Sequence, residues 1–485
     1  MALAPRCLGE GDSAEFTLAL ALTGAAHPPG YPLYTLAGSV FVHALRGAGL
    51  GWAHAANLWS ACGAAAAIFA LVTLADRLLP PTGRLRGGAR ACVIALALLP
   101  LAAHPTFLRA ATQAEVYSWE VAWTAALAVT ALGFLRHLDA DAPPLETRSL
   151  LRAALAWGAL AGVALAHRPT MLAFAGSFTV TLASSAARRG VLRPALLAAA
   201  FGAALLPASA NLWFAYRALH PAAFQWPLLE PGVNGLLQHT AGAIYRSYLG
   251  ARVGGGSGLA LVGTLLPLFA LGAAALAWMI PSIARRGDRP ALACLLALAG
   301  AAVAQGAFVA VYAVSDFDFF LLPALVPVTM AFALALARML ERSEAPLTPA
   351  ALALTTSLCV AAVPVVQESA RLAQVAAADA SVREAFDALP FERGVVVWNS
   401  DSHTRLVALQ LLEGRKRGVV VLNGGVLTWP AARRDAAKRL GFDPLEGLEL
   451  RTDEDLARIA PHLAERPGLA VADFGLWWSA RAAGN

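Results

Sequence analysis

Residues 291–313 read ALACLLALAGAAVAQGAFVAVYA, a run of 23 positions without a charged side chain. A helix of about 20 apolar residues is long enough to cross a lipid bilayer. The whole chain shares this character, since 58% of its 485 residues are hydrophobic and 14% are charged, whereas soluble domains carry about a quarter charged residues. The composition therefore predicts a mainly α-helical, polytopic membrane protein.

Nine further apolar runs extend this pattern along the chain. With the quoted run they predict ten membrane-spanning helices, near 55–76, 90–104, 117–135, 150–166, 169–187, 194–216, 258–283, 291–313, 319–337 and 347–366. The runs at 90–104 and 150–166 are short for a full crossing. Residues 31–45 predict another helix, and its length and the preceding Pro-Gly corner favour a position in the membrane interface.

Basic residues alternate between the loops that join these runs. One set of loops holds 15 arginines, and the other set, together with the N-terminal segment, holds seven. Because Lys and Arg gather in cytoplasmic loops, the richer set is predicted to be cytoplasmic. The N-terminal segment, the loops near 105–116 and 218–257, the turns at 167–168 and 315–318 and the tail after 366 are then extracytoplasmic. The N-terminal segment has no signal peptide to carry it across, so we expect a further helix before it.

Two classes of site find no support in the sequence. Basic residues interleaved with aromatic ones, the pattern of a nucleic acid interface, do not occur. Four of the five cysteines fall in predicted spans and only Cys7 lies outside them, a pattern without a disulfide framework or metal knuckle.

The tail has a different composition from the rest of the chain. GVVVWNSD at 394–401, GVVVLNGG at 418–425 and LAVADF at 469–474 predict strands, and HTRLVALQLLEG at 403–414 predicts an amphipathic helix between the first two. Alternating strands and helices indicate a small α/β domain with a partly parallel sheet. We therefore divide the chain into a transmembrane domain, 1–366, and an extracytoplasmic α/β domain, 367–485. Asp401 and Ser402 could contact a ligand, but a cap on the following helix is the more frequent role.

Carboxylates are rare outside the tail and gather on the predicted outer face. They are Glu10, Asp12, Glu15, Glu115, Glu120, Glu230, Asp316 and Asp318. Charges at the edges of apolar spans are costly and usually mark function. Asp12 and Glu15 are three residues apart, so they share a face if they lie on a helix, although Asp12 or Ser13 could also cap that helix.

The segment His27-Pro-Pro-Gly-Tyr31-Pro is a rigid turn, since its prolines fix φ and its glycine provides a corner. Such a turn can hold His27 and Tyr31 against the membrane surface, or it can simply redirect the chain.

Several motifs resemble those of a known family. GDSAEF at 11–16, followed by HPPGYPLY at 27–34 and NLWSA at 57–61, resembles the opening signature of a multi-span family that includes a transmembrane protein O-mannosyltransferase. QAEVYSWE at 113–120, AHRPT at 166–170 and DFDFFLLP at 316–323 are similar to later motifs of that family. The chain departs from the family at Ala14, where a glycine is usual, and in lacking the first helix.

The resemblance implies a GT-C-like glycosyltransferase architecture and a polyprenyl-phosphate-linked sugar donor. By this likeness Asp12 takes the catalytic position, with Glu15 as its alternative. Sugar transfer needs a base to deprotonate the acceptor hydroxyl and positive charge or donors for the leaving phosphate. Such a displacement would invert the anomeric centre. The acceptor could be protein, lipid or glycan, and a divalent metal ion between the acids is compatible with the residues but not required by their spacing.

The remaining site residues follow from the same chemistry. Arg168, beside His167 at the membrane edge, is a candidate phosphate ligand because arginine binds phosphate bidentately, and Arg109 and Arg246 are its rivals. The other predicted substrate contacts are His27, Tyr31, Glu115, Tyr117, Asp316 and Asp318. Each later assignment has a structural alternative: His167 and Arg168 could simply end a helix, and Glu115 could be a cap.

Two other functions remain open. A transporter would also place charges at helix ends, but internal repeats and interrupted helices near the midplane are typical of that class, and no repeat is found. A non-enzymatic assembly factor of the cell envelope would use the tail as its binding module.

Overall fold

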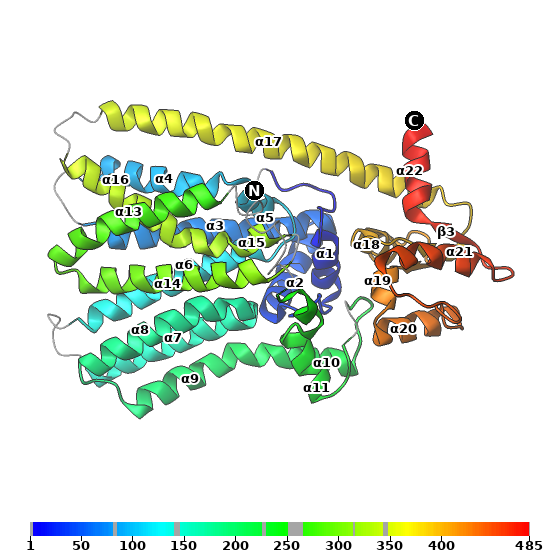
Figure 1. The fold of residues 1–485 in the computed structure, drawn as a ribbon, viewed down its shortest axis with the longest axis horizontal. Coiled ribbons are helices and arrows are strands. Elements are labelled where there is room, and N and C mark those ends of the chain that lie inside the picture. Colours follow the sequence, from blue (N-terminus) through cyan, green and yellow to red (C-terminus); the bar gives the residue numbers. More distant parts are fainter. Residues whose placement is uncertain are drawn as a thin grey trace.

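The computed structural model describes residues 3–80, 85–139, 146–225, 229–250, 265–313, 316–342 and 348–484. Most of these residues lie in helices that run side by side along one direction and form a bundle (Figure 1). A small domain with strands, formed by the C-terminal part of the chain, lies at one end of the bundle. The predicted class, a mainly helical polytopic membrane protein with a small α/β C-terminal domain, is confirmed.

Eight helices within the described residues are long and apolar enough to cross a membrane. They are α3 (Trp52–Leu78), α6 (Tyr117–His137), α7 (Thr147–His167), η1 with α8 (Pro169–Arg188), α9 with α10 (Pro194–Leu219), α13 (Leu266–Arg285), α14 (Arg289–Val311) and α15 with α16 (Phe317–Arg342). Each corresponds to a predicted span, although part of the span at 258–283, residues 258–264, lies outside the described residues.

The short run at 90–104 forms half of a bent pair. Helix α4 (Gly88–Ala102) ends before His104, and α5 (Pro105–Thr112) leaves it at an angle of 80°. Pro105 disfavours a helical conformation at His104, which is extended and accepts a hydrogen bond from the Thr106 N–H through its own side chain. The bend was not predicted, and it makes α5 a separate short helix that carries Arg109.

Helix α6 occupies the middle of the bundle and contacts α3, α7, α8 and α14. Its inner positions are alanines, including Ala125, Ala128 and Ala131, which are fully buried. Small side chains let neighbouring helices approach closely within a membrane. The same device appears between α7 and α9, where a Cβ on Gly158 would lie 1.9 Å from the Ala200 carbonyl oxygen.

Two short helices lie at the end of the bundle that faces the C-terminal domain. Helix α1 (Ser13–Leu22) runs across this end, and α2 (Pro32–Gly47) packs against it and against α3 (Figure 1). The helix predicted at 31–45 is therefore present as α2, and its position in a membrane interface stays a prediction.

Helix α17 (Thr348–Asp387) connects the bundle to the C-terminal domain. It is 40 residues long, runs along the bundle and continues to the C-terminal domain (Figure 1). The predicted span at 347–366 falls on its first half, of which the side chains at 348–361 lie outside the described residues. The helix passes the proposed domain boundary at 366 without interruption, and Val382, Ala385 and Phe386 in its last turns pack in the core of the C-terminal domain.

The C-terminal domain is built on a three-stranded sheet. Strands β1 (Arg393–Val397), β2 (Gly418–Leu422) and β3 (Val471–Asp473) are all parallel, in the order β2-β1-β3. Alternate residues of β1 face two separate cores, one with α17, α18 (His403–Glu413) and α22 (Phe474–Gly484), the other with α20 (Pro430–Leu440) and α21 (Ile459–Ala464). Burial of both faces is typical of parallel sheets. The sheet is thus covered by helices on both faces, and one of them, α18, contacts α1 of the bundle.

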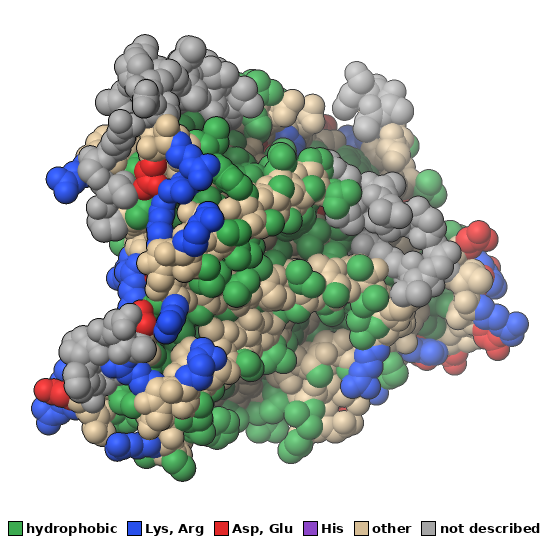
Figure 2. Space-filling model, turned by 60° about the vertical axis from the view of Figure 1, so that its left-hand side comes forward, with side chains coloured by type: hydrophobic (Ala, Val, Ile, Leu, Met, Phe, Trp, Pro, Cys, Tyr) green, Lys and Arg blue, Asp and Glu red, His purple; other side chains and the backbone are tan. Residues whose placement is uncertain are grey.

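Arginines mark the opposite end of the bundle. Figure 2 shows Lys and Arg side chains gathered there, away from the C-terminal domain. Arginines in the last helical turns contribute to this end, namely Arg77, Arg136, Arg188, Arg285 and Arg342. The two ends of the bundle therefore differ in charge.

Candidate active site

A cavity of about 1550 Å³ lies between the bundle and the C-terminal domain. Its wall is formed by the ends of α1, α5, α6, α8 and α14, by the segment η3 (Ala243–Tyr248), by α15 and by loops of the C-terminal domain. Of the twelve site residues predicted from the sequence, all except His167 line the described part of this wall. Segments far apart in the chain are thus brought to one place.

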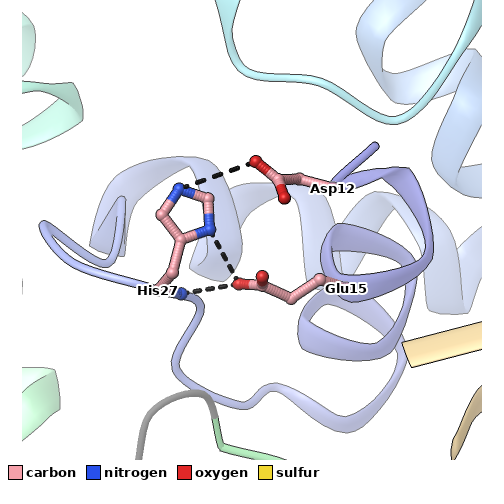
Figure 3. Close-up of side chains that lie close together, drawn as sticks. All are labelled: Asp12, Glu15 and His27. Carbon is pink, nitrogen blue, oxygen red and sulfur yellow. Dashed lines mark hydrogen bonds and ion pairs between the residues drawn. The ribbon is translucent and has the colours of Figure 1, made fainter. Parts of the chain in front are cut away.

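The N-terminal acids and His27 form the centre of the site (Figure 3). Glu15 Oε1 accepts a hydrogen bond from the His27 backbone N–H at 2.6 Å and lies 3.0 Å from His27 Nδ1. Asp12 Oδ2 lies 4.0 Å from Nε2 on the other side of the ring, and the Tyr31 hydroxyl is 3.3 Å from the same nitrogen. The imidazole is therefore held between two carboxylates, one in close contact and one at a distance.

Asp12 and Glu15 differ in their surroundings. The Glu15 side chain is 4% exposed and the Asp12 side chain 39% exposed. Asp12 precedes α1 at the N-cap position, yet its side chain makes no cap hydrogen bond with the described residues, so the capping alternative is not formed. Burial within the site raises the pKa of Asp12 to about 7, despite the neighbouring His27, and Glu15 and Asp12 raise the pKa of His27 to about 9 against the effect of burial. Asp12 is thus the carboxylate that a substrate can reach.

The same three residues could hold a divalent cation. Asp12, Glu15 and His27 each offer one ligand atom, and these atoms all lie within 4.8 Å of one another. Carboxylate oxygens with an imidazole nitrogen suit ions such as Zn²⁺ or Mn²⁺. Because Nδ1 of His27 faces Glu15, the histidine would bind the ion through Nε2. A cation at this point would supply positive charge next to a phosphate in the cavity.

The three candidate phosphate ligands have different environments. Arg168 is 3% exposed, and its Nη1 donates to Glu120 Oε2 at 2.7 Å. Its guanidinium also lies 4.6 Å from the ring centroid of Tyr117. By contrast, Arg109 Nε is buried and has no hydrogen-bond partner among the described residues, while Arg246 is exposed on the cavity wall. Arg109 and Arg246 therefore have more unused charge than Arg168, the first candidate by sequence.

Glu120 was recognised from the sequence as an outer carboxylate but was not assigned to the site. It is 1% exposed, and it accepts a second hydrogen bond from Thr170 Oγ1 at 2.9 Å. Glu120 lies three residues after Tyr117, so the two side chains share one face of the helix. Because the Tyr117 ring contacts the Arg168 guanidinium, this spacing is the sequence signal that could have suggested the pair of Glu120 with Arg168.

A second acidic group lines another part of the wall. The Tyr117 hydroxyl donates to Asp316 Oδ2 at 2.7 Å, and Thr106 Oγ1 donates to Asp318 Oδ2 at 2.8 Å. Glu115 is 4% exposed, and its Oε2 has no hydrogen-bond partner among the described residues. Burial raises the pKa of Glu115 well above its ordinary value. These groups can accept hydrogen bonds from the hydroxyls of a sugar.

His167 lies behind the cavity instead of in its described wall. Its Nε2 is 3.2 Å from the Val116 carbonyl oxygen, and its ring packs 6.5 Å from Tyr31 and 6.3 Å from Tyr34 between centroids. His167 therefore lies outside the described wall, because the helix end turns this side chain into the aromatic packing that supports Tyr31, and its substrate contact stays a prediction. This matches the structural alternative, in which His167 ends a helix.

The C-terminal domain completes the wall with the loops that follow β1 and β2. Asp401 lies in the loop between β1 and α18, Asn423 stands directly after β2, and both line the cavity together with Trp429. Helix α18 has Ser402 at its N-cap, without a side-chain cap hydrogen bond to the described residues, so the expected capping by Asp401 or Ser402 is not observed. Burial, followed by the charge of Glu15, raises the pKa of Asp401. The carboxyl ends of parallel strands are where α/β sheets bind ligands, which was the available signal for this part of the site.

The segment between α10 and α13 also contacts His27. Tyr245, in η3, lies 6.4 Å from the His27 ring, measured between centroids. The sequence placed this loop on the same side as Asp12 and singled out Arg246, but not its neighbour Tyr245.

Comparison with known proteins agrees with the motifs. Residues 12–191 match the family described as the protein O-mannosyl-transferase TMEM260 N-terminal domain, which confirms the resemblance found in the sequence. No curated protein matches the chain. Among solved structures, the chain is similar to ArnT from Cupriavidus metallidurans bound to undecaprenyl phosphate, with 15% identity, a TM-score of 0.45, and coverage of 99% of this chain and 85% of that one.

An oligosaccharyltransferase from Archaeoglobus fulgidus, in complex with Zn and sulfate, is also similar. The identity is 15%, the TM-score is 0.42 and 86% of this chain is covered. This chain spans 59% of the length of the archaeal protein.

Proposed function

We propose that this protein is a membrane glycosyltransferase that moves a sugar from a polyprenyl-phosphate donor to a hydroxyl group on an extracytoplasmic acceptor. One observation carries the proposal. A single cavity holds a reachable carboxylate, Asp12, beside His27 and, elsewhere in its wall, cations with unused charge, Arg109 and Arg246. This cavity lies within and next to the segment that matches an O-mannosyl-transferase domain.

Asp12 is suited to be the base. A catalytic base works best when its pKa lies near the working pH, and the pKa of Asp12 is raised to about 7. The carboxylate takes the proton of the acceptor hydroxyl while the hydroxyl oxygen attacks the anomeric carbon and the bond to the lipid phosphate breaks. Glu15 holds His27 through its backbone and ring, and therefore supports the base. A single displacement of this kind inverts the anomeric configuration.

The other walls suit the two ends of a lipid-linked donor. Arg109 and Arg246 can receive the charge that develops on the leaving phosphate. Leu172 on α8 and Phe308 on α14 line the side of the cavity towards the bundle, and Leu172 is 63% exposed. An apolar wall that opens beside membrane-spanning helices fits a polyprenyl chain, which would otherwise have to leave the bilayer.

The orientation follows from the charge of the two ends. Arginines gather at the end of the bundle away from the cavity (Figure 2), and basic loops favour the cytoplasmic side. We therefore propose that the cavity and the C-terminal domain face the extracytoplasmic, or periplasmic, side of a plasma or inner membrane.

The competing functions are less well supported. A transporter is expected to bind its substrate near the midplane of the membrane between repeated halves. The acidic groups of the described cavity instead gather at one end of the bundle, beside a folded domain. A non-enzymatic assembly factor would not need a carboxylate of raised pKa beside a histidine.

The direct test uses the purified protein in lipid nanodiscs. It is incubated with a panel of labelled polyprenyl-phosphate sugars and an extract of membranes and envelope material, and labelled products are separated by protease digestion and solvent extraction into protein, lipid and glycan. We expect one donor to label one class of acceptor, with inverted linkage by NMR, and Asp12→Asn to abolish the labelling. If no donor of the panel yields a product, or if the labelled donor crosses the membrane of proteoliposomes unchanged, the proposal fails.

The same purified protein is used to test whether Asp12, Glu15 and His27 hold a divalent metal ion. Elemental analysis before and after treatment with a chelator shows whether the purified protein holds a divalent ion, and substitution of His27 by Ala should release it. If activity persists without the ion, Asp12 acts as a base and not as a metal ligand.

A further inference from the structure

The geometry points to Arg405 and Arg371 as positioning residues that hold the catalytic segment Gly9–Asp12 in place from the C-terminal half of the chain. This inference rests on the proposed function, since it assigns these residues a role in the transfer that Asp12 performs. Neither arginine touches the substrate cavity in the part of its wall that the structure describes. Their effect would therefore pass through the backbone of the segment.

The segment Gly9–Asp12 has little regular structure to hold it. Gly11 has a φ of +56°, in the left-handed region that glycine tolerates best. A Cβ on Gly9 would lie 2.5 Å from Ser13 Oγ and 2.8 Å from Gln113 Cβ, so the backbone passes close to α1 and to the end of α5. The Glu10 N–H donates to Gln113 Oε1 at 3.2 Å. Contacts with neighbouring elements therefore decide where the Asp12 carboxylate lies.

Arg405 supplies one such contact from the C-terminal domain. It lies in α18, is 6% exposed, and its Nη2 donates a hydrogen bond to the Gly9 carbonyl oxygen. Its Nη1 is 3.7 Å from Asp379 Oδ1 in α17, and Asp379 is itself fixed by a hydrogen bond of 2.7 Å from Arg383 Nε. A buried guanidinium is costly unless its N–H groups are paired, so the Gly9 carbonyl is an integral partner of this side chain.

Arg371 supplies a second contact from α17. Its Nη1 forms an ion pair with Glu10, and its Nε and Nη2 donate to the two oxygens of Glu368 at 2.8 and 2.7 Å. Glu368 is 5% exposed and accepts a hydrogen bond of 2.6 Å from Thr112 Oγ1, at the end of α5. Arg371 thereby links the segment to the helix that carries Arg109.

Apolar packing places the C-terminal domain behind the same segment. Leu8, Ala14 and Leu18 form a buried cluster with Ala408 of α18 and with Phe224. Helix α1 therefore rests directly on α18, and Arg405 lies on the same helix three residues before Ala408. The apolar contact brings the domain to α1, and the hydrogen bond from Arg405 to Gly9 fixes the position of the backbone that leads to Asp12.

The test compares Arg405→Ala, Arg405→Lys and Arg371→Ala with a matched control, Arg433→Ala. Arg433 also belongs to the C-terminal domain and forms an arginine–aspartate pair, with Asp443, but it contacts neither the segment nor the cavity among the described residues. Full-length proteins in nanodiscs are compared by amide hydrogen exchange and by transfer kinetics with whichever donor the labelling experiment identifies.

We expect Arg405→Ala to lower kcat by at least about tenfold, the factor that one hydrogen bond to a charged group contributes, with the donor KM nearly unchanged. Arg371→Ala should lower kcat less, by up to about fivefold, because its partner Glu10 is half exposed. Exchange at residues 9–13 should accelerate by a similar factor, while exchange in β1 stays slow and shows that the domain is folded. Arg405→Lys, which keeps a donor for the Gly9 carbonyl, should recover much of kcat, and Arg433→Ala should leave both measurements unchanged.

The outcomes separate this inference from the proposed function. If Arg405→Ala retains kcat and slow exchange at residues 9–13, or if its loss of kcat is matched by Arg433→Ala, the positioning role is overturned. If the unmodified protein transfers no sugar, the proposed function fails, and the exchange measurement still shows whether Arg405 holds the segment.

Discussion

Replacing Asp12 with asparagine tests the assignment of the base directly. Asparagine keeps the size of the side chain but cannot accept a proton from the acceptor hydroxyl. Because general base catalysis contributes about 10²–10⁴-fold, kcat should fall by that factor, whereas the donor KM should change little, since the base acts only in the transition state.

The structure also predicts the effect on stability. The Asp12 side chain is 39% exposed, lies 4.0 Å from His27 Nε2 and makes no cap hydrogen bond with the described residues. An ion pair of this kind contributes about 0–1 kcal/mol, so the free energy of unfolding of Asp12→Asn should stay within that range of the parent protein.

Glu15→Gln is the matched comparison. Glu15 is 4% exposed, and its Oε1 accepts from the His27 backbone N–H at 2.6 Å. Weakening buried hydrogen bonds of a charged group costs about 1–3 kcal/mol, so this variant should lose more stability than Asp12→Asn but less kcat. Both are measured by thermal unfolding and by single-turnover transfer in nanodiscs. If Asp12→Asn retains kcat within a few fold, or if Glu15→Gln loses all transfer without losing stability, the base is not Asp12.

Three other substitutions have distinct expected results. Arg109→Gln should lower kcat/KM for the donor by about tenfold or more, because a charge-assisted hydrogen bond to phosphate is lost, with unchanged thermal unfolding; an unchanged kcat/KM would contradict its role. Arg168→Gln should instead destabilise the fold by about 3–5 kcal/mol, because it leaves Glu120 buried without its partner, and normal unfolding of this variant would contradict the buried pair. Asp401→Asn tests whether Asp401 contacts the acceptor. Hydrolysis of the donor without acceptor should stay unchanged, whereas the amount of membrane extract needed for half-maximal transfer should rise by about tenfold. A parallel loss of hydrolysis would instead assign Asp401 to the donor.

The sequence predicted the helical class well because the signal for a membrane helix is long and repeated. It missed the bend between α4 and α5, which depends on Pro105 and on the side-chain hydrogen bond at His104. The run at 90–104 is apolar enough for a helix, and composition does not show where a helix changes direction. This bend matters for the site, since it sets the direction of α5, which carries Arg109.

The site was predicted less completely because its residues acquire their roles from partners distant in the chain. The local sequence indicates a phosphate ligand at Arg168 but does not show that Glu120, 48 residues away in sequence, pairs with it. His167 and Arg168 are neighbours, yet only Arg168 reaches the cavity. The sequence predicts a helix cap at Asp401 because capping is a local rule, whereas its position in the cavity wall that also holds Asp12 depends on how the C-terminal domain docks.

The hydrogen bond between Arg405 and Gly9 has a consequence for biosynthesis. Its two residues are 396 positions apart, and a ribosome that adds about 5–20 residues per second needs roughly 20–80 s to cover that distance. The segment Gly9–Asp12 is therefore synthesised long before Arg405, a partner of its backbone, exists. On the proposed function, a product that ends before Arg405 should insert its spans and yet hold residues 9–12 less firmly, so that it transfers sugar more slowly than the full-length protein.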